Sequence, residues 1–273
     1  MTSEFAGKTV IITGASAGVG AATARAFAKQ KAKLVLLARG QEALNKIEKE
    51  LSQLTEVLSI AMDVVDSDAC ADMLANAESR FGAVHILINN AGYHQRGSVE
   101  DNEVDKLALM VDVNLRAPIE LTRLVLPYIR RAGSGAIVNV GSLAGRTPLQ
   151  GAATYAATKA GLRAFTYSLA DELRGTGIFV GVVSPGPIDT GFIMSEIDQV
   201  EDIVFSQPMS STEQVASAIM RIARGEKVEI SMPKVSGFLS TLSYLFPSLR
   251  HALRPALYKK GRKEKEKYRQ RNA

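Results

Sequence analysis

The sequence predicts an α/β fold in which a doubly wound, seven-stranded parallel sheet is covered by helices on both faces. Two observations support this prediction. Short runs of aliphatic and β-branched residues alternate with longer stretches of helical periodicity, and the apolar runs are continuous, as in strands that are covered on both faces. The seven runs are residues 9–13, 33–38, 57–64, 84–90, 136–142, 178–184 and 227–232.

The stretches between these runs supply the expected helical layers. The longest, residues 103–131, contains Pro118, which predicts a kink in an otherwise continuous helix. Strands that alternate with crossover helices give a parallel sheet with right-handed connections. We therefore expect one dinucleotide-binding and catalytic domain at residues 1–232, followed by an apolar and then basic helical extension at residues 233–273.

Composition indicates the cellular environment in which the protein is expected to work. The single cysteine, Cys70, has small and apolar neighbours, which predicts a core residue and a reducing, cytoplasmic environment. Residues 1–8 lack the pattern of a signal peptide, and glycines with Arg25 interrupt the apolar segment 10–28, so neither a secretory segment nor a transmembrane helix is expected. No His, Cys or carboxylate cluster has metal-ligand spacing, so we expect no metal.

Charge is distributed unevenly along the chain. The net charge is +5, but residues 250–273 carry +8 and residues 1–249 carry −3, so the main body is not expected to bind nucleic acid. The basic run alternates with glutamates, as in a solvated helix or a frayed end. It follows an apolar stretch, residues 235–258, that two prolines interrupt. This order leaves open whether the tail contacts an anionic membrane surface or folds over its own protein or a partner subunit.

A glycine-rich turn lies between the first strand and the first helix. It reads TGASAGVG, residues 13–20, and contains Gly14, Gly18 and Gly20. Glycine suits positions where the backbone takes a positive φ or where another group approaches closely. At the start of a helix, free amide groups and the helix dipole favour a phosphate. The turn therefore predicts the pyrophosphate site of a Rossmann-type fold.

Arg39 follows the second strand, where such folds meet the adenosine ribose. An acidic residue there would accept hydrogen bonds from both ribose hydroxyls, whereas an arginine pairs with a 2′-phosphate. Arg39, together with the hydroxyl of Ser16, therefore favours NADP(H) over NAD(H). The alternative is a solvated arginine at the start of a loop.

The sequence YAATK places Tyr155 and Lys159 four residues apart in a helical stretch. Side chains at this spacing share one helix face, and a nearby ammonium lowers the pKa of a phenol, which makes it an acid or base nearer neutral pH. Ser142 ends the fifth strand, at the edge of the sheet where α/β folds bind ligands, and its hydroxyl could hold a substrate carbonyl. A surface Tyr–Lys pair and a turn-capping serine are the alternatives.

Six motifs in order make residues 5–232 resemble the single-domain short-chain dehydrogenase/reductases. Four of them are sequence segments: TGASAGVG, with the spacing TGxxxGxG; NNAG at 89–92; NVGSLAG around Ser142; and PGPIDT at 185–190. The other two are Asn114 in VDVNLRA and the YxxxK pair of Tyr155 and Lys159.

The resemblance implies hydride transfer between a nicotinamide and a carbonyl or secondary alcohol, with Asn114, Ser142, Tyr155 and Lys159 as the catalytic tetrad. Tyr155 would protonate the substrate oxygen and Ser142 would hold it. Lys159 would bind the nicotinamide ribose and lower the pKa of Tyr155, and Asn114 would retain a water. The implied cofactor contacts are Gly14, Ser16, Gly18, Val19, Gly20, Arg39, Asp63 near the adenine, Val64, Asn90 near the adenosine ribose, Ala91, Gly92, Tyr155, Lys159, Pro185, Gly186, Ile188, and Thr190 near the carboxamide.

Residues 191–207 carry eight large apolar side chains, which predicts a lid over an apolar substrate, unless several of them pack on the sheet. Together with the tail, this segment favours a lipophilic ketone or alcohol as substrate. We expect His94 to line the substrate or to lie in an exposed loop. The small residues of helix 155–164 and the resemblance together predict a homodimer or homotetramer.

Three other functions remain open on the sequence alone. An NAD-dependent alcohol dehydrogenase would share the tetrad and differ at Arg39. A nucleotide-sugar epimerase or dehydratase would use the same Tyr and Lys, but the glycine spacing and the lack of a large second domain disfavour it. A dinucleotide-binding module at a membrane surface, without turnover, is the third.

Overall fold

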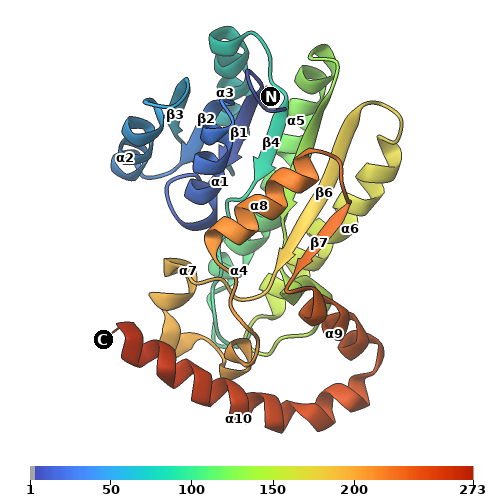
Figure 1. Cartoon of the computed structure of the whole chain (residues 1–273). Helices are drawn as coiled ribbons and strands as arrows, with labels where there is room; N and C mark the ends of the chain where they lie inside the picture. Colours follow the sequence, from blue (N-terminus) through green and yellow to red (C-terminus); the bar gives the residue numbers. More distant parts are fainter. Residues whose placement is uncertain (1–3, 273) are drawn as a thin grey trace.

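The computed structural model describes residues 4–272, and its centre is a seven-stranded parallel sheet with strand order β3-β2-β1-β4-β5-β6-β7 (Figure 1). The chain reverses direction across the sheet between β1 and β4, which creates a crevice at the carboxyl edge. The strands are β1 (Thr9–Thr13), β2 (Lys33–Ala38), β3 (Val57–Ala61), β4 (Ile86–Asn89), β5 (Gly135–Val140), β6 (Ile178–Pro185) and β7 (Glu229–Met232).

Helices cover both faces of the sheet, as the sequence predicts. One face packs on α1, α2 and α8, and the other packs on α3, α5 and α6. The helices of the main body are α1 (Gly18–Lys29), α2 (Gln41–Leu51), α3 (Ser67–Phe81), α4 (Val104–Val111), α5 (Ala117–Arg131), α6 (Ala153–Glu172), α7 (Gly191–Met194) and α8 (Thr212–Ala223).

The continuous apolar runs fill two cores because successive strand residues point to opposite faces. On β2, Leu34 and Leu36 enter the core under α1 and α8, whereas Val35 and Leu37 enter the core under α3 and α5. Cys70 is buried in this second core, where the sequence placed it, and burial raises the pKa of its thiol to about 11.

The long helical segment before β5 is interrupted where proline predicts it, but the interruption is not a simple kink. The segment consists of α4, a π-helical turn at Asp112–Arg116 and α5, and Pro118 lies in the first turn of α5. Proline has no N–H to donate to the carbonyl of Asn114, four residues earlier, so the α-helical ladder cannot continue through this point. Such π turns often lie at functional sites.

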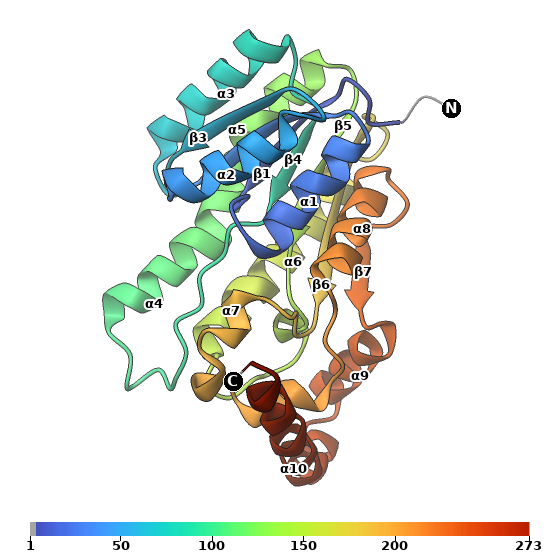
Figure 2. The same cartoon turned by 60° about the vertical axis from the view of Figure 1, so that its left-hand side comes forward.

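Beyond β7 the chain forms two helices, α9 (Lys234–Leu245) and α10 (Pro247–Asn272). Figures 1 and 2 show α10 passing beneath α7 at the carboxyl edge of the sheet. The sequence suggested a tail broken by proline, yet α10 continues through Pro255. Proline cannot donate a hydrogen bond to the carbonyl of His251, four residues earlier. His251 is exposed, so water can bond that carbonyl instead, and the helix loses little stability.

Candidate active site

The glycine turn between β1 and α1 has the backbone geometry that its sequence requires. Gly14 and Gly18 have φ values of +65° and +52°, in the left-handed region. A Cβ on Gly20 would collide with the carbonyl of Gly14, so the start of α1 packs directly on the turn. Helix α1 has neither a side-chain N-cap nor an acidic residue in its first turn, so its amide groups remain available to an anion.

Hydrogen bonds join this turn to the ends of two neighbouring strands. The Asn90 side chain donates to the carbonyls of Thr13 (2.8 Å) and Gly14 (3.2 Å). The Thr13 hydroxyl accepts from the amides of Asn90 (2.9 Å) and Ala91 (2.8 Å). On the other side, the amide of Ala15 donates to the carbonyl of Leu37 at the end of β2 (3.0 Å). The side-chain amide of Asn90 therefore holds the glycine turn in place, a role that the sequence did not suggest.

The residues expected near the adenosine end lie at the same edge. Arg39 directly follows β2 and is exposed, next to the strand end that holds the turn. Strand β3 ends at Ala61, two residues before Asp63 and earlier than the apolar run predicts. The Asp63 carboxylate accepts a hydrogen bond from the amide of Val65 (3.2 Å), which orders the loop after β3 and buries Val64.

The segment after β6 closes the other side of the crevice. The amide of Gly186 donates to the carbonyl of Met232 (2.6 Å), and Ile188 forms an isolated bridge with Ser210. The Thr190 methyl lies 3.6 Å from the position of a Cβ on Gly18. The PGPIDT segment and the glycine turn, which are about 170 residues apart in the sequence, therefore face each other across the crevice.

Ser142, Tyr155 and Lys159 meet beside this crevice. Ser142 lies just beyond β5, where its hydroxyl accepts from the amide of Ala144 (3.1 Å) and hydrogen-bonds the Tyr155 phenol. Lys159 is buried, its Nζ donates to the Val140 carbonyl (2.9 Å), and this Nζ lies 5.8 Å from the centre of the Tyr155 ring. One helix face thus presents a phenol and an ammonium to the end of β5.

The pKa values differ from the sequence-based expectation for Tyr155. Burial raises the pKa of the phenol above its ordinary value, while the Ser142 hydrogen bond and the charge of Arg96 partly offset that rise. We expected Lys159 to lower this pKa, but its Nζ points to Val140, and desolvation lowers the pKa of Lys159 itself to about 8. Without a ligand, the phenol is therefore held in its protonated form.

Asn114, in the π-helical turn, holds the loop in front of the site. Its side-chain oxygen accepts from the amide of Tyr93 (2.8 Å) and its amide donates to the Tyr93 carbonyl (2.7 Å). A Cβ on Gly92 would lie 3.6 Å from Asn114 Oδ1 and 3.9 Å from Lys159 Nζ, so the NNAG segment lies directly beside both side chains. The water-holding role expected for Asn114 stays a prediction.

His94 and Arg96 extend the site in a way that the sequence only partly indicated. The His94 ring stacks on Tyr155, with ring centres 4.0 Å apart and planes 12° apart, so His94 lines the site. Arg96 donates to His94 Nδ1 (3.1 Å) and to the Phe192 carbonyl (2.7 Å), and pairs with Glu196 (3.1 Å). Burial, Arg96 and Lys159 together lower the pKa of His94 to about 3, so the imidazole is neutral.

Glu229, on β7, anchors the helix that carries the tyrosine and lysine. It is buried and pairs with Arg163 of α6 (2.8 Å) and with Arg146 (3.3 Å), and it accepts hydrogen bonds from Ser184 (2.6 Å) and Tyr167 (2.8 Å). Burial alone would raise the pKa of Glu229, but these donors and charges bring it below its ordinary value. No local motif marks Glu229, because its partners come from three other segments.

The expected lid is only partly available to a substrate. Ile193, Val200 and Phe205 form a small core of their own, which Tyr268 of α10 joins. Phe192 instead is 45% exposed, and its ring centre lies 6.3 Å from that of His94. That these residues face the substrate therefore stays a prediction for Phe192, whereas the buried three pack within the lid.

Residues 4–272 contain neither a cluster of metal-ligating side chains nor a helix that could span a membrane. No three His, Cys, Asp or Glu side chains of this part of the chain come together in an arrangement that could hold a metal ion. None of its helices is long and apolar enough to cross a bilayer.

Comparison with known proteins gives a consistent result. The family described as short chain dehydrogenase matches residues 8–201. A ketoacyl reductase of Nostoc is 34% identical over 82% of this chain and 78% of its own length. An NADP-dependent 3-hydroxy acid dehydrogenase of Schizosaccharomyces pombe is 34% identical over 84% of this chain and 92% of its own. The crystal structure of a short-chain type dehydrogenase/reductase from Mycobacterium marinum superposes with a TM-score of 0.78 and 25% identity, over 84% of this chain and 95% of that one.

Proposed function

Since the chain belongs to the short-chain dehydrogenase family, which makes it an oxidoreductase acting on CH–OH and C=O groups, we propose that it is an NADP(H)-dependent reductase of lipophilic ketones. The observation that carries the proposal is the arrangement of Ser142, Tyr155 and Lys159 beside the glycine turn. This arrangement supports two assignments: Tyr155 as the proton donor to the substrate oxygen, and the glycine turn as the binding site of the dinucleotide.

The chain's own residues supply everything except the hydride, which the bound nicotinamide would provide. The glycine turn fits a pyrophosphate, because its helix start is uncapped, Gly14 and Gly18 have positive φ, and Gly20 packs directly on the turn. Tyr155, protonated at neutral pH, gives its proton to the substrate oxygen that the Ser142 hydroxyl holds. Lys159 offers an ammonium to the ribose hydroxyls, and the neutral His94 ring fixes the orientation of Tyr155 by stacking.

Arg39 supports the choice of NADP(H). It is exposed at the end of β2, beside the turn, where its guanidinium can pair with a 2′-phosphate. The name of the fission yeast relative also includes NADP. The remaining cofactor contacts that the sequence suggested, including Ser16, Val19, Ala91 and Pro185, belong to the same proposal.

A lipophilic substrate is supported by Phe192, whose exposed ring lies in the lid segment near His94. Two similar proteins are named for acyl or small polar substrates: the Nostoc ketoacyl reductase and a sulfoacetaldehyde reductase of Chromohalobacter salexigens. The latter is 38% identical over 68% of this chain and 74% of its own length. A substrate panel must therefore include long-chain ketones, 3-keto acids and sulfoacetaldehyde.

We place the enzyme in the cytoplasm and infer a homodimer or homotetramer. The outward side of α6 carries Ala157, Ala160 and Ala164, all exposed, which permits close approach of another helix. Exposed Val111 and Ile119 lie on the adjoining helical segment. Light scattering tests this part, and a monomer that persists at high concentration would contradict it.

The decisive experiment follows the oxidation of NADPH and NADH with the substrate panel. The wild type should prefer NADPH, and Tyr155→Phe should lose about 10²-fold or more in kcat. Arg39→Asp should change the NADPH-to-NADH preference by about 10- to 100-fold toward NADH, since a charge-assisted bond is lost. Arg174→Asp, at an exposed site in the turn after the Tyr155 helix, is the matched control. A wild type that prefers NADH would favour an alcohol dehydrogenase instead, and full function in Tyr155→Phe would favour a binding module without turnover.

A further inference from the structure

Helix α9 turns its small polar face toward the protein and its apolar face outward. Gly237 and Ser240 are buried, whereas Phe238 is 69% exposed and Leu239 is 53% exposed. Gly237 lies so close to Ser231 that a Cβ would collide with it. A surface helix of a water-soluble protein normally buries its apolar stripe, so α9 has the reverse arrangement.

Specific polar contacts hold α9 in this orientation. Arg146, beside the active site, donates to the hydroxyls of Ser231 and Thr241, the latter at 2.7 Å. The hydroxyls of Thr147 and Ser243 lie 2.7 Å apart in a second hydrogen bond. Because these partners require the polar face of α9 to point inward, the helix cannot rotate to bury Phe238 without losing them.

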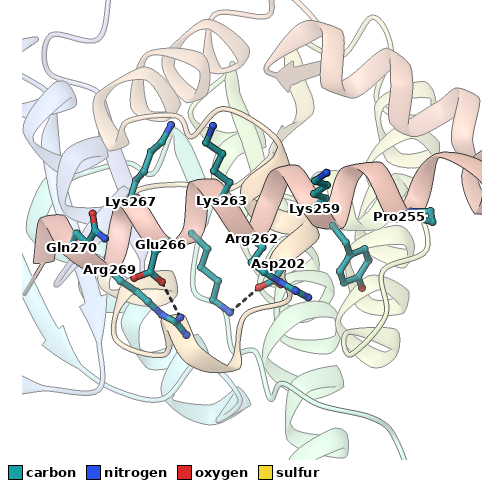
Figure 3. A pocket seen from close by; sticks show the side chains of 11 residues that line it. Asp202, Pro255, Lys259, Arg262, Lys263, Glu266, Lys267, Arg269 and Gln270 are labelled. Atoms are coloured by element: carbon teal, nitrogen blue, oxygen red, sulfur yellow. Dashed lines mark hydrogen bonds and ion pairs between the residues drawn. The ribbon is translucent and has the colours of Figure 1, made fainter.

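Helix α10 also has an outward face, and this face changes from apolar to basic along the helix. Residues three and four apart share a helix face, and one such face contains Leu249, Leu253, Lys260, Lys263 and Lys267, all of them exposed. In Figure 3, the side chains of Lys263 and Lys267 point away from Asp202, one of the lid residues that α10 contacts.

The opposite face of α10 holds the substrate lid. Lys265 is buried, donates to the Val200 carbonyl (2.6 Å) and pairs with Asp202 (3.3 Å). Gly261 packs so tightly on the carbonyl of Asp202 that any side chain would collide. The sequence suggested a solvated or frayed tail, but this half of the helix is fixed to the protein, so its lysines present a fixed pattern of charge.

We propose that these two helices form a docking surface for an anionic lipid bilayer. The docking surface consists of an apolar part, which inserts among the lipids, and a basic part, which pairs with phosphate-bearing headgroups. The apolar part is Val235, Phe238, Leu239, Leu245, Phe246, Leu249 and Leu253, and the basic part is Lys260, Lys263 and Lys267.

Charge distinguishes a bilayer from a second copy of the chain as the occupant. Residues 250–273 carry +8, so a second copy that covered the apolar part symmetrically would bring two strongly cationic segments together. An anionic membrane surface attracts that charge instead. Contact at the surface also agrees with the finding that none of the helices within residues 4–272 can span a bilayer.

The position of the lid gives the docking surface a consequence for the reaction, and this consequence rests on the proposed function. A bilayer bound to the outward face of α10 lies one helix away from the lid that Lys265 and Gly261 hold. A lipophilic ketone dissolved in that bilayer would reach the site without crossing bulk water. Bound vesicles should therefore lower the KM for a membrane-partitioned ketone and leave the KM for a soluble one unchanged.

Cosedimentation with vesicles tests the docking surface directly. The full-length protein should sediment with vesicles of phosphatidylcholine mixed with phosphatidylglycerol, and raised salt should weaken the binding. Phe238→Glu should reduce the partition coefficient about tenfold or more, because a charge replaces an inserted ring. Val104→Glu, which adds the same charge at another exposed apolar position, is the matched control and should bind as the wild type does.

The basic part has its own pair of variants. Reversing Lys260 and Lys263 to Glu should reduce binding about 30-fold or more, since each lysine near an anionic surface contributes about fivefold. Reversing Lys49 and Lys106, two exposed lysines on other helices, should leave it nearly unchanged. The proposal is overturned if the wild type does not sediment with anionic vesicles. It is also overturned if each test variant binds the vesicles as well as its matched control does. It is also overturned if Phe238→Glu abolishes self-association in sedimentation velocity while vesicle binding is absent.

These readouts separate the docking surface from the proposed reaction. Vesicle binding requires no turnover, so a chain that binds lipid but reduces no ketone would refute only the function. Conversely, full activity of Phe238→Glu on a soluble ketone shows that its loss of lipid binding is not a loss of folding.

Discussion

Two buried lysines, Lys159 in the active site and Lys265 under the lid, have opposite electrostatic surroundings. Lys265 pairs with Asp202 and donates to the Val200 carbonyl. Lys159 donates only to the Val140 carbonyl, forms no ion pair with a carboxylate of residues 4–272, and has its pKa lowered to about 8 by desolvation. A compensated charge stabilises the fold, whereas an uncompensated one weakens the fold but leaves an ammonium available to a ligand.

The largest expected effect of this difference is on activity. Replacing Lys159 with Met removes the ammonium that faces the crevice, and kcat/KM should fall by about 10²- to 10⁴-fold. Replacing Lys265 with Met loosens the lid without touching the site, so the fall should be less than about tenfold and should appear mainly in KM. Steady-state kinetics with NADPH and a soluble ketone measures both, and equal losses in the two variants would remove the distinction.

Stability should change in opposite directions in the same two variants. Lys265→Met leaves Asp202 without its buried partner and should lower the free energy of unfolding by about 2 kcal/mol. Lys159→Met removes a desolvated ammonium and should raise it by about 1–3 kcal/mol at pH 7. Denaturant unfolding of both variants against the wild type gives the two signs, and a loss in both would show that Lys159 is structural.

The pH dependence provides the control for Lys159→Met. The lysine has a pKa of about 8 in the fold and an ordinary value of 10.5, so the unfolded chain binds more protons between these values. The stability contribution of Lys159 therefore becomes less unfavourable as the pH rises from about 8 toward 10.5. The advantage of the Met variant should shrink across that window, and an advantage independent of pH would point to packing instead.

Local sequence patterns predicted much of the fold and the centre of the site. Continuous apolar runs located all seven strands, because strands covered on both faces have no polar alternation, although strand ends differed by a few residues. Tyr155 and Lys159 were found because i, i+4 spacing fixes a shared helix face. In each case the physical cause lies within a few consecutive residues.

What the sequence missed depends on contacts between distant segments. The network of Glu229 joins four separate segments, and no local spacing marks it. Lys265 is one of ten basic residues in its segment, and only the packing of Gly261 on Asp202 selects it for burial. The predicted direction of the Tyr155 pKa shift was also wrong, because burial of the phenol raises its pKa and the Lys159 Nζ points to the Val140 carbonyl.

The smallest expected effect concerns His94, which is neutral and stacks on Tyr155. Its pKa is about 3 in the fold against an ordinary value of 6.5, because burial and the charges of Arg96 and Lys159 disfavour the imidazolium. The unfolded chain therefore binds more protons between these values, and the stability that His94 contributes above pH 6.5 is lost as the pH falls toward 3.

Replacing His94 with Phe keeps a ring against Tyr155 and removes the titration, so the loss of stability between pH 7 and pH 5 should shrink by about 1–2 kcal/mol. Urea unfolding at the two pH values measures this difference, with His251→Phe at an exposed position as the control. If the acid dependence of stability is unchanged in His94→Phe, the His94 ring can accept a proton in the folded protein. His94, as well as the Tyr155 phenol, would then be a candidate proton donor to the substrate.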